Sequence, residues 1–327
     1  MLNTFRFKEL IPFVLRSVPY IHQSHTGKAY CALESLYAQR PQLPDAVWEY
    51  CSSLIREDEP KVEGLLAPEL LALKEIVDPT SGRDFGPDWI LGRGLMPLSY
   101  WAMQQKVQEQ GFEAVFKEYL KRALEHPRSL GHELSILSGN WRFYQTAIAS
   151  SERPEERALF LQRFTEFVTV TFARGEQDLI QTIDPSQTIK TTPSLMHQLS
   201  EAEVLVDALT NPGFFGHHVL AFVWGMRLKP MLSEAEHRQL LMNLSLINGE
   251  DGRDDPTRQL RAIDERWDDE ELDRRLAAFF LHGPTNIHQI TLAEALLWCW
   301  SHYPDYRGLI AANFACFSEG VSPRALQ

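Results

Sequence analysis

Apolar residues recur every three or four positions along most of the chain, and this periodicity constrains the fold more than any other feature of the sequence. Residues 111–126 place their apolar side chains at this spacing, and Pro127 ends the run. A second run, residues 154–174, opens on Pro154, and proline is favoured in the first turn of a helix. Such spacing puts the apolar side chains on one face, so both runs are predicted to be amphipathic helices.

Two further helix starts carry the polar signature of a capping box. Ser200 precedes Glu203 by three positions, and Ser233 precedes Glu236 by the same interval. The periodicity predicts helices in eight more ranges, the sixth of them holding two helices: 44–56, 68–77, 97–110, 131–150, 213–229, 256–282, 288–302 and 305–318. Loops are expected at 57–66, 78–95, 184–198 and 247–256. The loop at 78–95, rich in Gly, Pro and Asp, is either a lid or a plain surface connection.

Strand signals are nearly missing from the sequence. The dipeptides Asn248-Gly249 and Asp251-Gly252 mark hairpins when alternating apolar runs flank them, but here they stand in an acidic stretch. The sequence therefore predicts an all-α protein. Its length favours a single large multi-helical domain of about a dozen helices over residues 1–327.

Charge and cysteine content disfavour several classes of protein. The chain carries 32 Lys and Arg against 44 Asp and Glu, a formal net charge of −12, and an acidic surface repels nucleic acid and anionic membranes. The N-terminal segment is interrupted by charges, and no apolar run reaches about 20 residues, so neither a signal peptide nor a membrane helix is expected. The four cysteines are too scattered for a disulfide framework. We expect a cytoplasmic protein.

The histidines hold the remaining chemical signal, because the motifs of nucleotide cofactors, zincins and serine hydrolases are all missing. Four predicted helices each place histidine near the N-terminal end, ahead of an apolar face: His25, His132, His217 with His218, and His288. A neutral imidazole is a ligand for iron, zinc or copper. The alternative for each is a core histidine that forms a hydrogen bond or caps a helix.

Four histidine-bearing segments follow one another along the chain: Ser24-His25-Thr26-Gly27; the stretch 91–139, with His132 in a small-residue helix; Gly216-His217-His218-Val219; and His288-Gln289-Ile290-Thr291-Leu292-Ala293-Glu294-Ala295, with Pro304-Asp305 downstream. These segments and their order resemble the questin oxidase-like family of helical oxidoreductases. The resemblance implies oxidative, ring-cleaving or Baeyer–Villiger-like steps on aromatic polyketides, in secondary metabolism. It also implies a mononuclear non-haem iron held by histidines, as in one branch of the family.

Carried over residue by residue, the resemblance points to His25, His132, His217 or His218, and His288 as iron ligands, with His132 and His25 as the candidate catalytic residues. The family branch adds a modified lysine ligand from the C-terminal helix.

The chain departs from the family at that lysine. Thr291 stands in its position, and no lysine follows Lys229. Lys28 is the nearest substitute, although a solvated or snorkelling lysine is the preferred interpretation.

Three aromatic residues lie on helices that carry a candidate ligand and are predicted to contact a substrate: Trp141, Tyr144 and Trp298. Ordinary core packing is the alternative for such side chains. The favoured function is an oxygenase-like oxidoreductase acting on an aromatic or hydrophobic small molecule. A non-catalytic small-molecule-binding or accessory protein without metal is the second, and a metal-free enzyme with His25 or His132 as general base is the third.

Overall fold

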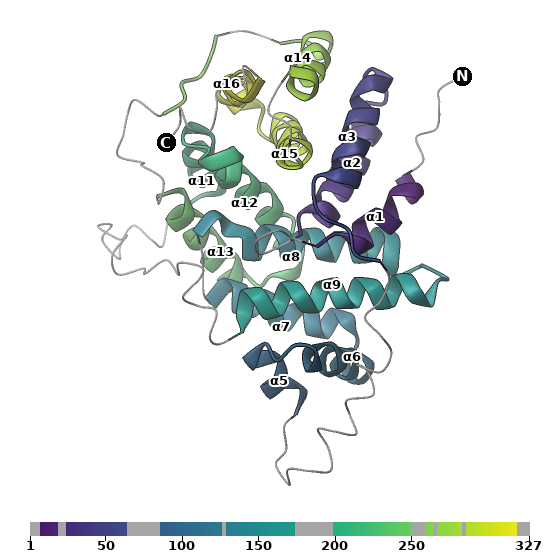
Figure 1. The fold of residues 1–327 in the computed structure, drawn as a ribbon. Helices are drawn as coiled ribbons and strands as arrows, with labels where there is room; N and C mark the ends of the chain where they lie inside the picture. Colours follow the sequence, from purple (N-terminus) through teal and green to yellow (C-terminus); the bar gives the residue numbers. More distant parts are fainter. Residues whose placement is uncertain are drawn as a thin grey trace.

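A computed structural model of the chain describes residues 7–18, 24–63, 86–125, 129–173, 199–249, 259–264, 267–282 and 286–318. The predicted all-α class is confirmed: these residues form α-helices and short 3-10 segments, and the described ranges contain no strand (Figure 1). A single antiparallel bridge joins Ser17 to Lys61. The helix expected at 68–77 and the loop expected at 184–198 lie outside the described residues.

Fourteen α-helices are described, with bounds as follows: α1 (Ile11–Arg16), α2 (Thr26–Gln39), α3 (Asp45–Glu57), α5 (Pro87–Arg93), α6 (Leu98–Gln110), α7 (Phe112–Glu125), α8 (His132–Phe143), α9 (Pro154–Phe172), α11 (Glu201–Thr210), α12 (His217–Met226), α13 (Glu234–Asn248), α14 (Asp269–His282), α15 (His288–His302) and α16 (Arg307–Ser318). A π-helical turn, Tyr144–Ile148, continues α8. The 3-10 segments are Phe7–Leu10, Ser129–Gly131, Phe214–Gly216, Lys229–Met231 and Pro304–Tyr306.

Both predicted capping boxes are confirmed. The Ser200 hydroxyl accepts a hydrogen bond from the Glu203 backbone at the start of α11, and the Glu203 carboxylate accepts one from the Ser200 backbone. Ser233 and Glu236 make the same reciprocal pair at the start of α13. Each box pairs two backbone donors that a helix start otherwise leaves without partners.

The prediction of a loop at 78–95 is wrong for part of that range, because the short helix α5 lies within it. Pro87 stands in the first helical turn, and Gly94 ends the helix in the left-handed conformation, with φ 62°. Asp88 in the first turn lies 2.5 Å from the ammonium of Lys106 on α6. The helix is short, so its apolar period was too brief to stand out, although its proline and glycine occupy the usual boundary positions.

The prediction of two helices in 256–282 is also wrong for the described part of that range, which contains only α14. Residues 259–264 instead run without regular structure past the start of α16. There the Ile263 backbone N–H donates to the Gly308 carbonyl over 3.1 Å. Backbone pairing with another element thus replaces the bonds that a helix would have made internally.

Four helices form a closed ring at the centre of the fold. Helix α2 packs against α8 and α15, and α12 packs against the same two neighbours. The N-terminal histidines of these helices meet at one end. Residues further along also meet, since Cys31 contacts Gly139 and Ser35 contacts Glu294. The helices therefore run in the same direction. Helix α7 packs against α8, and α9 packs against the π-helical turn that continues α8, while α14 and α16 pack against α15 (Figure 1). One hydrophobic core runs through all these helices.

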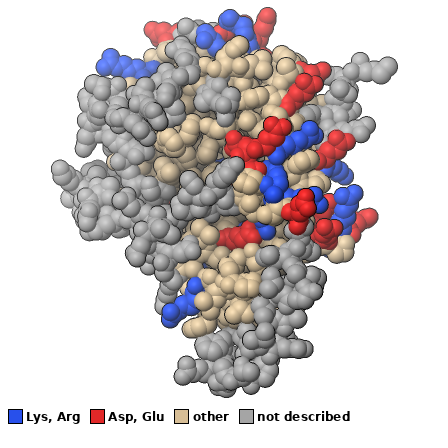
Figure 2. All heavy atoms as spheres, viewed as in Figure 1, with Lys and Arg blue, Asp and Glu red and all other residues tan. Residues whose placement is uncertain are grey.

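Among the described helices, none combines the length and apolar character that a membrane crossing requires. The four cysteines, Cys31, Cys51, Cys299 and Cys316, are free thiols. On the face in Figure 2, Lys and Arg side chains on the right lie among Asp and Glu side chains.

Candidate metal centre

Four of the five candidate histidines meet at one end of the central ring. The His132 Nε2 atom lies 2.9 Å from His217 Nε2 and 3.5 Å from His25 Nε2. The ring of His288 is centred 4.6 Å from that of His25 and 5.0 Å from that of His217. We call His25, His132, His217 and His288 the imidazole cluster.

The position of each histidine in its helix explains why the rings converge. His25 is the N-cap of α2, and His132, His217 and His288 are the first residues of α8, α12 and α15. Side chains on a helix lean toward its N-terminus. Four helices whose N-termini meet therefore direct these side chains into the same space.

His132 and His217 follow the same unusual backbone turn. Leu130 and Gly131 precede His132 with φ of 65° and 61°, and Phe215 and Gly216 precede His217 with φ of 50° and 74°. Left-handed backbone is unfavourable for leucine and phenylalanine, so the surrounding packing must hold these turns.

The glycine of each turn also permits close packing with the next helix of the ring. A Cβ atom on Gly131 would lie 2.6 Å from the Ala221 methyl of α12. A Cβ atom on Gly216 would lie 2.6 Å from Leu292 of α15. Neither contact leaves room for a side chain, so the two glycines set how closely the histidine-bearing helix ends approach each other.

His25 and His288 are held differently, by two carboxylates that follow α3. The Glu59 carboxylate accepts the His25 backbone N–H over 2.7 Å and lies 3.4 Å from His25 Nδ1. The Asp58 carboxylate accepts the backbone N–H of Ile287, next to His288, over 3.3 Å. One short segment thus fixes the starts of two helices.

Glu59 stays ionised although it is buried. Burial alone would raise its pKa, but hydrogen bonds and the charge interaction with His25, together with the Thr26 hydroxyl, lower that pKa to about 2. The carboxylate beside Nδ1 favours a proton on that nitrogen, which leaves His25 Nε2 to face the cluster. His217 Nδ1 is likewise bonded to the Phe214 carbonyl, which directs His217 Nε2 toward His132.

His217 and His288 are neutral at physiological pH. Burial lowers the pKa of His217 to about 3 and the pKa of His288 well below its usual value. Neutral imidazole is the form that binds a metal ion. His288 Nε2 is also buried without a hydrogen-bond partner among the described residues, and such an atom calls for an explanation.

The ring nitrogens of His25, His132 and His288 can hold a metal ion. No pair of these ligand atoms is separated by more than 4.8 Å. Ligand nitrogens lie about 2.0–2.1 Å from a bound ion, so two of them are at most about 4.2 Å apart. Two nitrogens on opposite sides of an ion would have to close by up to roughly 0.6 Å, and two at a tetrahedral angle, which are about 3.4 Å apart, by up to roughly 1.4 Å. The unpartnered Nε2 of His288 fits the same interpretation.

His218 is the candidate histidine that the structure does not bring into the cluster. It is buried on α12, and its Nδ1 atom lies 2.5 Å from the Asn211 carbonyl oxygen. Of the two histidines at the start of α12, it is therefore His217 whose ring lies beside the other imidazoles. His218 takes the structural role, a core histidine bonded to a loop carbonyl.

Lys28 corrects the expectation of a solvated or snorkelling side chain. Only 2% of it is exposed, and its ammonium group lies 3.3 Å from the Ser135 hydroxyl of α8. Burial lowers the pKa of Lys28 to about 7, against a raising effect of the Glu59 charge. The lysine fits because Gly139 on α8 has no side chain where the Lys28 stem passes.

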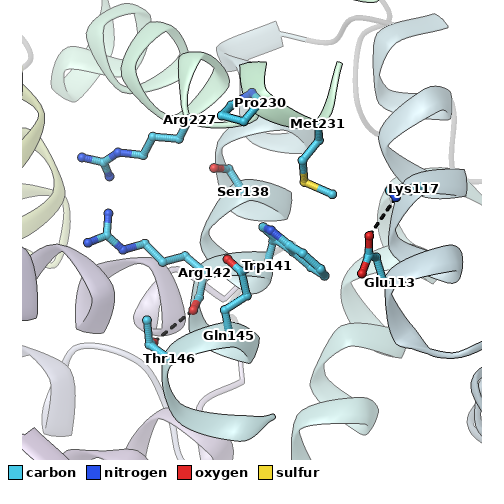
Figure 3. A pocket seen from close by; sticks show the side chains of 10 residues that line it. All are labelled: Glu113, Lys117, Ser138, Trp141, Arg142, Gln145, Thr146, Arg227, Pro230 and Met231. Carbon is cyan, nitrogen blue, oxygen red and sulfur yellow. Dashed lines mark hydrogen bonds and ion pairs between the residues drawn. The ribbon is translucent and has the colours of Figure 1, made fainter. Parts of the chain in front are cut away.

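The predicted substrate-binding aromatics lie away from the cluster. Trp141 lines a cavity of about 740 Å³ (Figure 3). Tyr144 packs on Phe112 with ring centres 4.3 Å apart. Trp298 stacks on His302 near the far end of α15. Ten residues separate Trp298 from His288, which corresponds to about 15 Å of helix.

Sequence reasoning missed Asp58, Glu59 and the burial of Lys28. The two carboxylates stand at the end of α3, in what the sequence marks only as a loop, and no spacing connects them to histidines. Their role becomes visible only when α2 and α15 are in place.

No protein-family model matches the chain, and comparisons with curated proteins and with solved structures found no match.

Proposed function

We propose that the chain is a metal-dependent oxidoreductase, whose centre is a non-haem iron held by His25, His132 and His288 with His217 beside them. The observation that carries the proposal is the approach of the three ring nitrogens to within 4.8 Å of one another. Imidazole ligands suit iron, zinc and copper alike. Iron is favoured because the histidine segments resemble those of the questin oxidase-like family.

The residues around the centre have different roles in such a reaction. Bound iron supplies redox chemistry with dioxygen that no side chain here provides. Glu59 and the Phe214 carbonyl orient two of the imidazoles through their Nδ1 atoms. Lys28, with a pKa of about 7, can accept or release a proton near the rings at neutral pH.

An aromatic or hydrophobic substrate suits the surface beside the cluster. Phe214 stacks on His217 with nearly parallel rings, 7° apart, and 39% of the residue is exposed. The His25 side chain keeps 17% of its surface accessible, whereas His217 is 2% exposed. His25 is thus the more accessible of these two rings to a substrate, and the exposed Phe214 ring offers an apolar surface beside His217.

The partners follow from the same features. A hydrophobic small molecule is proposed as substrate, with neither nucleic acid nor a membrane as partner, because the net charge of the chain is −12. We place the protein in the cytoplasm, where free thiols such as Cys31, Cys51, Cys299 and Cys316 stay reduced.

A second function, a small-molecule-binding or accessory protein without metal, is favoured by one distance. The 2.9 Å between His132 Nε2 and His217 Nε2 is the length of a direct hydrogen bond, which satisfies both atoms without an ion. The absence of any lysine after Lys229 points the same way, since the family's lysine ligand has no counterpart there.

Metal loading separates the two functions. The full chain is incubated anaerobically with Fe(II); one portion is desalted for elemental analysis, and another is unfolded thermally with Fe(II) still present. We expect about one iron per chain and stabilisation of about 2.7 kcal/mol at a free-metal concentration 100 times Kd. His288→Gln should abolish both effects, and His302→Gln, an exposed histidine of the same helix, should leave both unchanged.

The outcome for the metal-free function is equally definite. If Fe(II), Mn(II) and Zn(II) neither bind nor raise the unfolding temperature, the metal centre is refuted. If metal binds, oxygen consumption with aromatic substrates should require iron and not appear with zinc, because zinc has no redox chemistry. Equal activity with both metals would refute the oxidoreductase while keeping the metal site.

A further inference from the structure

The cavity that Trp141 lines lies apart from the imidazole cluster. It has a volume of about 740 Å³ and is bordered by α7, by α8 with the π-helical turn after it, and by the segment that follows α12 (Figure 3). Trp141 follows His132 by nine residues on α8, about 14 Å of helix. The volume falls within the range of about 300–1,000 Å³ that small-molecule sites occupy. The cavity can therefore hold a ligand of its own, separate from whatever the cluster binds.

Charged side chains around the cavity are already paired with opposite charges. Lys117 and Glu113, one turn apart on α7, lie 2.8 Å from each other (Figure 3). The Arg227 guanidinium donates through Nη2 to the buried Glu294 carboxylate, and its Nη1 atom is enclosed by the protein. This guanidinium is thus engaged inside the fold and is not offered to a ligand.

Arg142 is the remaining cation among the described residues that line the cavity, and Glu34 on α2 offsets it. Burial raises the pKa of the Glu34 carboxyl, and the positive charge of Arg142 opposes that rise. Each cation therefore has a carboxylate beside it, and no net charge is left to select an ion. A ligand of either sign would have to displace one member of a pair or stay without a counter-charge, which is unfavourable away from water.

One wall of the cavity is apolar and flat. The Trp141 ring stacks on Phe116, with centres 4.7 Å apart and planes 26° apart. Phe112 and Tyr144 also stack with this indole, at 15° and 24°, so its orientation is fixed. Met231 lines the cavity near the same ring (Figure 3). An indole and a thioether together suit an aromatic ring.

Neutral hydrogen-bonding groups complete the lining. Ser138 lies one turn before Trp141 on α8, and Gln145 lies one turn after it. Neither the Ser138 hydroxyl nor the Gln145 side-chain amide forms a hydrogen bond with another described residue. Both groups can donate and accept, so they can bind an uncharged polar group.

We propose that this cavity binds an uncharged aromatic molecule that carries an amide or a hydroxyl group. The aromatic ring would lie on Trp141 beside Met231, and the polar group would form hydrogen bonds with Ser138 and Gln145. The site does not depend on the proposed metal centre, because the ligand would be held about 14 Å from His132 along α8.

Three matched probes test the proposal on the full chain in the presence of a metal chelator. Isothermal titration calorimetry would compare indole-3-acetamide, indole-3-acetate and tryptamine, which share one ring and are neutral, negative and positive. We expect the amide to bind at least tenfold more tightly than either ion, because a charge that stays unpaired on binding loses at least that much affinity. This comparison needs no variant, so it holds whatever substitutions do to folding.

Variants then locate the site. Ser138→Ala should weaken indole-3-acetamide binding about three- to tenfold, the usual effect of one neutral hydrogen bond, and Ser301→Ala, at an exposed serine of α15, should leave it unchanged. Glu34→Gln should strengthen indole-3-acetate binding about tenfold, because Arg142 then has no carboxylate beside it. His288→Gln should keep amide binding while losing metal.

The proposal is overturned by equal affinity for the three probes, by tighter binding of either ion, or by no binding of the amide at millimolar concentration. Full amide affinity in Ser138→Ala would overturn the location of the site. Unchanged indole-3-acetate affinity in Glu34→Gln would show that paired charges are not what excludes ions.

Discussion

Left-handed turns that end in Gly131 and Gly216 place His132 and His217. In contrast, two carboxylates, Asp58 and Glu59, hold the starts of the helices that carry His288 and His25. We call the first pair with its turns the glycine half, and the second pair with its carboxylates the carboxylate half. The glycine half depends on local backbone conformation and on space at a helix contact. The carboxylate half depends on ionised groups brought from a distant segment.

This difference teaches how each half can fail. The glycine half should respond to added volume, because its turns carry no charge and depend on space at a helix contact. The carboxylate half should respond to loss of charge, because Glu59 is buried and held by several donors. The predictions below separate these two sensitivities.

The largest expected effect is that of Gly131→Ala in the glycine half. The new methyl group would lie 2.6 Å from the Ala221 Cβ, at a residue with φ of 61°. Overpacking costs about 1–3 kcal/mol and left-handed backbone at a non-glycine residue about 1–2 kcal/mol. We expect the free energy of unfolding to fall by about 2–5 kcal/mol in denaturant titrations.

Gly92→Ala is the matched control, because an added Cβ there meets nothing within 4 Å. It lies within α5, where alanine is the better helix former, so stability should hold or rise by up to about 1 kcal/mol. Similar losses in the two variants would show that space at Gly131 is not what places His132.

Glu59→Gln should have the next largest effect and acts on the carboxylate half. The substitution keeps the shape of the side chain and removes its charge. Hydrogen bonds to a charged group contribute about 1.5–3 kcal/mol, and we expect a loss of that size at pH 7. Metal affinity should fall roughly 10–100-fold, the usual effect of removing a partner that orients a ligand.

Glu57→Gln provides the comparison, since Glu57 is exposed at the end of α3. Its stability and metal affinity should equal those of the parent chain, measured by the same titrations. A Glu59→Gln chain that binds Fe(II) normally would mean that α2 and α15 position His25 and His288 without the carboxylates.

The helices were predictable and the partners of the histidines were not, for reasons visible in α12. Every residue of α12 is buried, so no polar face tells His217 from its neighbour His218. The sequence therefore marks a histidine at this helix start but not which one faces the cluster. Lys28 shows the same limit, because its burial depends on Gly139 and Ser135, more than 100 positions away.

The glycine half was partly predictable for the opposite reason. Gly131 and Gly216 stand directly before His132 and His217, so the signal is local and can be read along the chain. The carboxylate half offers no such signal, because Glu59 and His25 are 34 positions apart. A turn that places the next residue can be recognised from neighbouring residues in the sequence, whereas contacts between distant segments are known only from the fold.

Acid titration of the metal-free chain should show a smaller, graded effect. The unfolded chain protonates its histidines near pH 6.5, but folded His217, with a pKa of about 3, does so only at much lower pH. The unfolded state thus binds more protons between these values, and stability falls as pH drops from about 6.5 toward 3. The slope is at most about 1.4 kcal/mol per pH unit for each such histidine.

The carboxylate half adds its own loss at lower pH. Glu59 has a folded pKa of about 2 against an ordinary value of 4.5, so its contribution is present above pH 4.5 and disappears as pH falls toward 2. Urea titrations at several pH values would resolve the two ranges. His217→Gln should reduce the slope of the upper range, to which His288 also contributes, and Glu59→Gln should reduce the slope of the lower range. If His217→Gln leaves the upper slope unchanged, His217 is not held neutral by its surroundings.

The smallest expected effect tests whether the left-handed turn before His132 is strained. In Leu130→Gly, the strain of a φ of 65° is removed, which should stabilise the chain by about 1–2 kcal/mol. The greater chain entropy of glycine in the unfolded state should destabilise it by about 0.5–1 kcal/mol, and the contacts of a half-buried side chain are also lost. These terms nearly cancel, so denaturant titration should find a change within about 1 kcal/mol. Leu134→Ala, at a fully buried position of α8, should lose about 2–5 kcal/mol. A comparable loss in Leu130→Gly would mean that the leucine side chain, and not the glycine after it, holds the turn, and the glycine half would then depend on side-chain packing instead of backbone conformation.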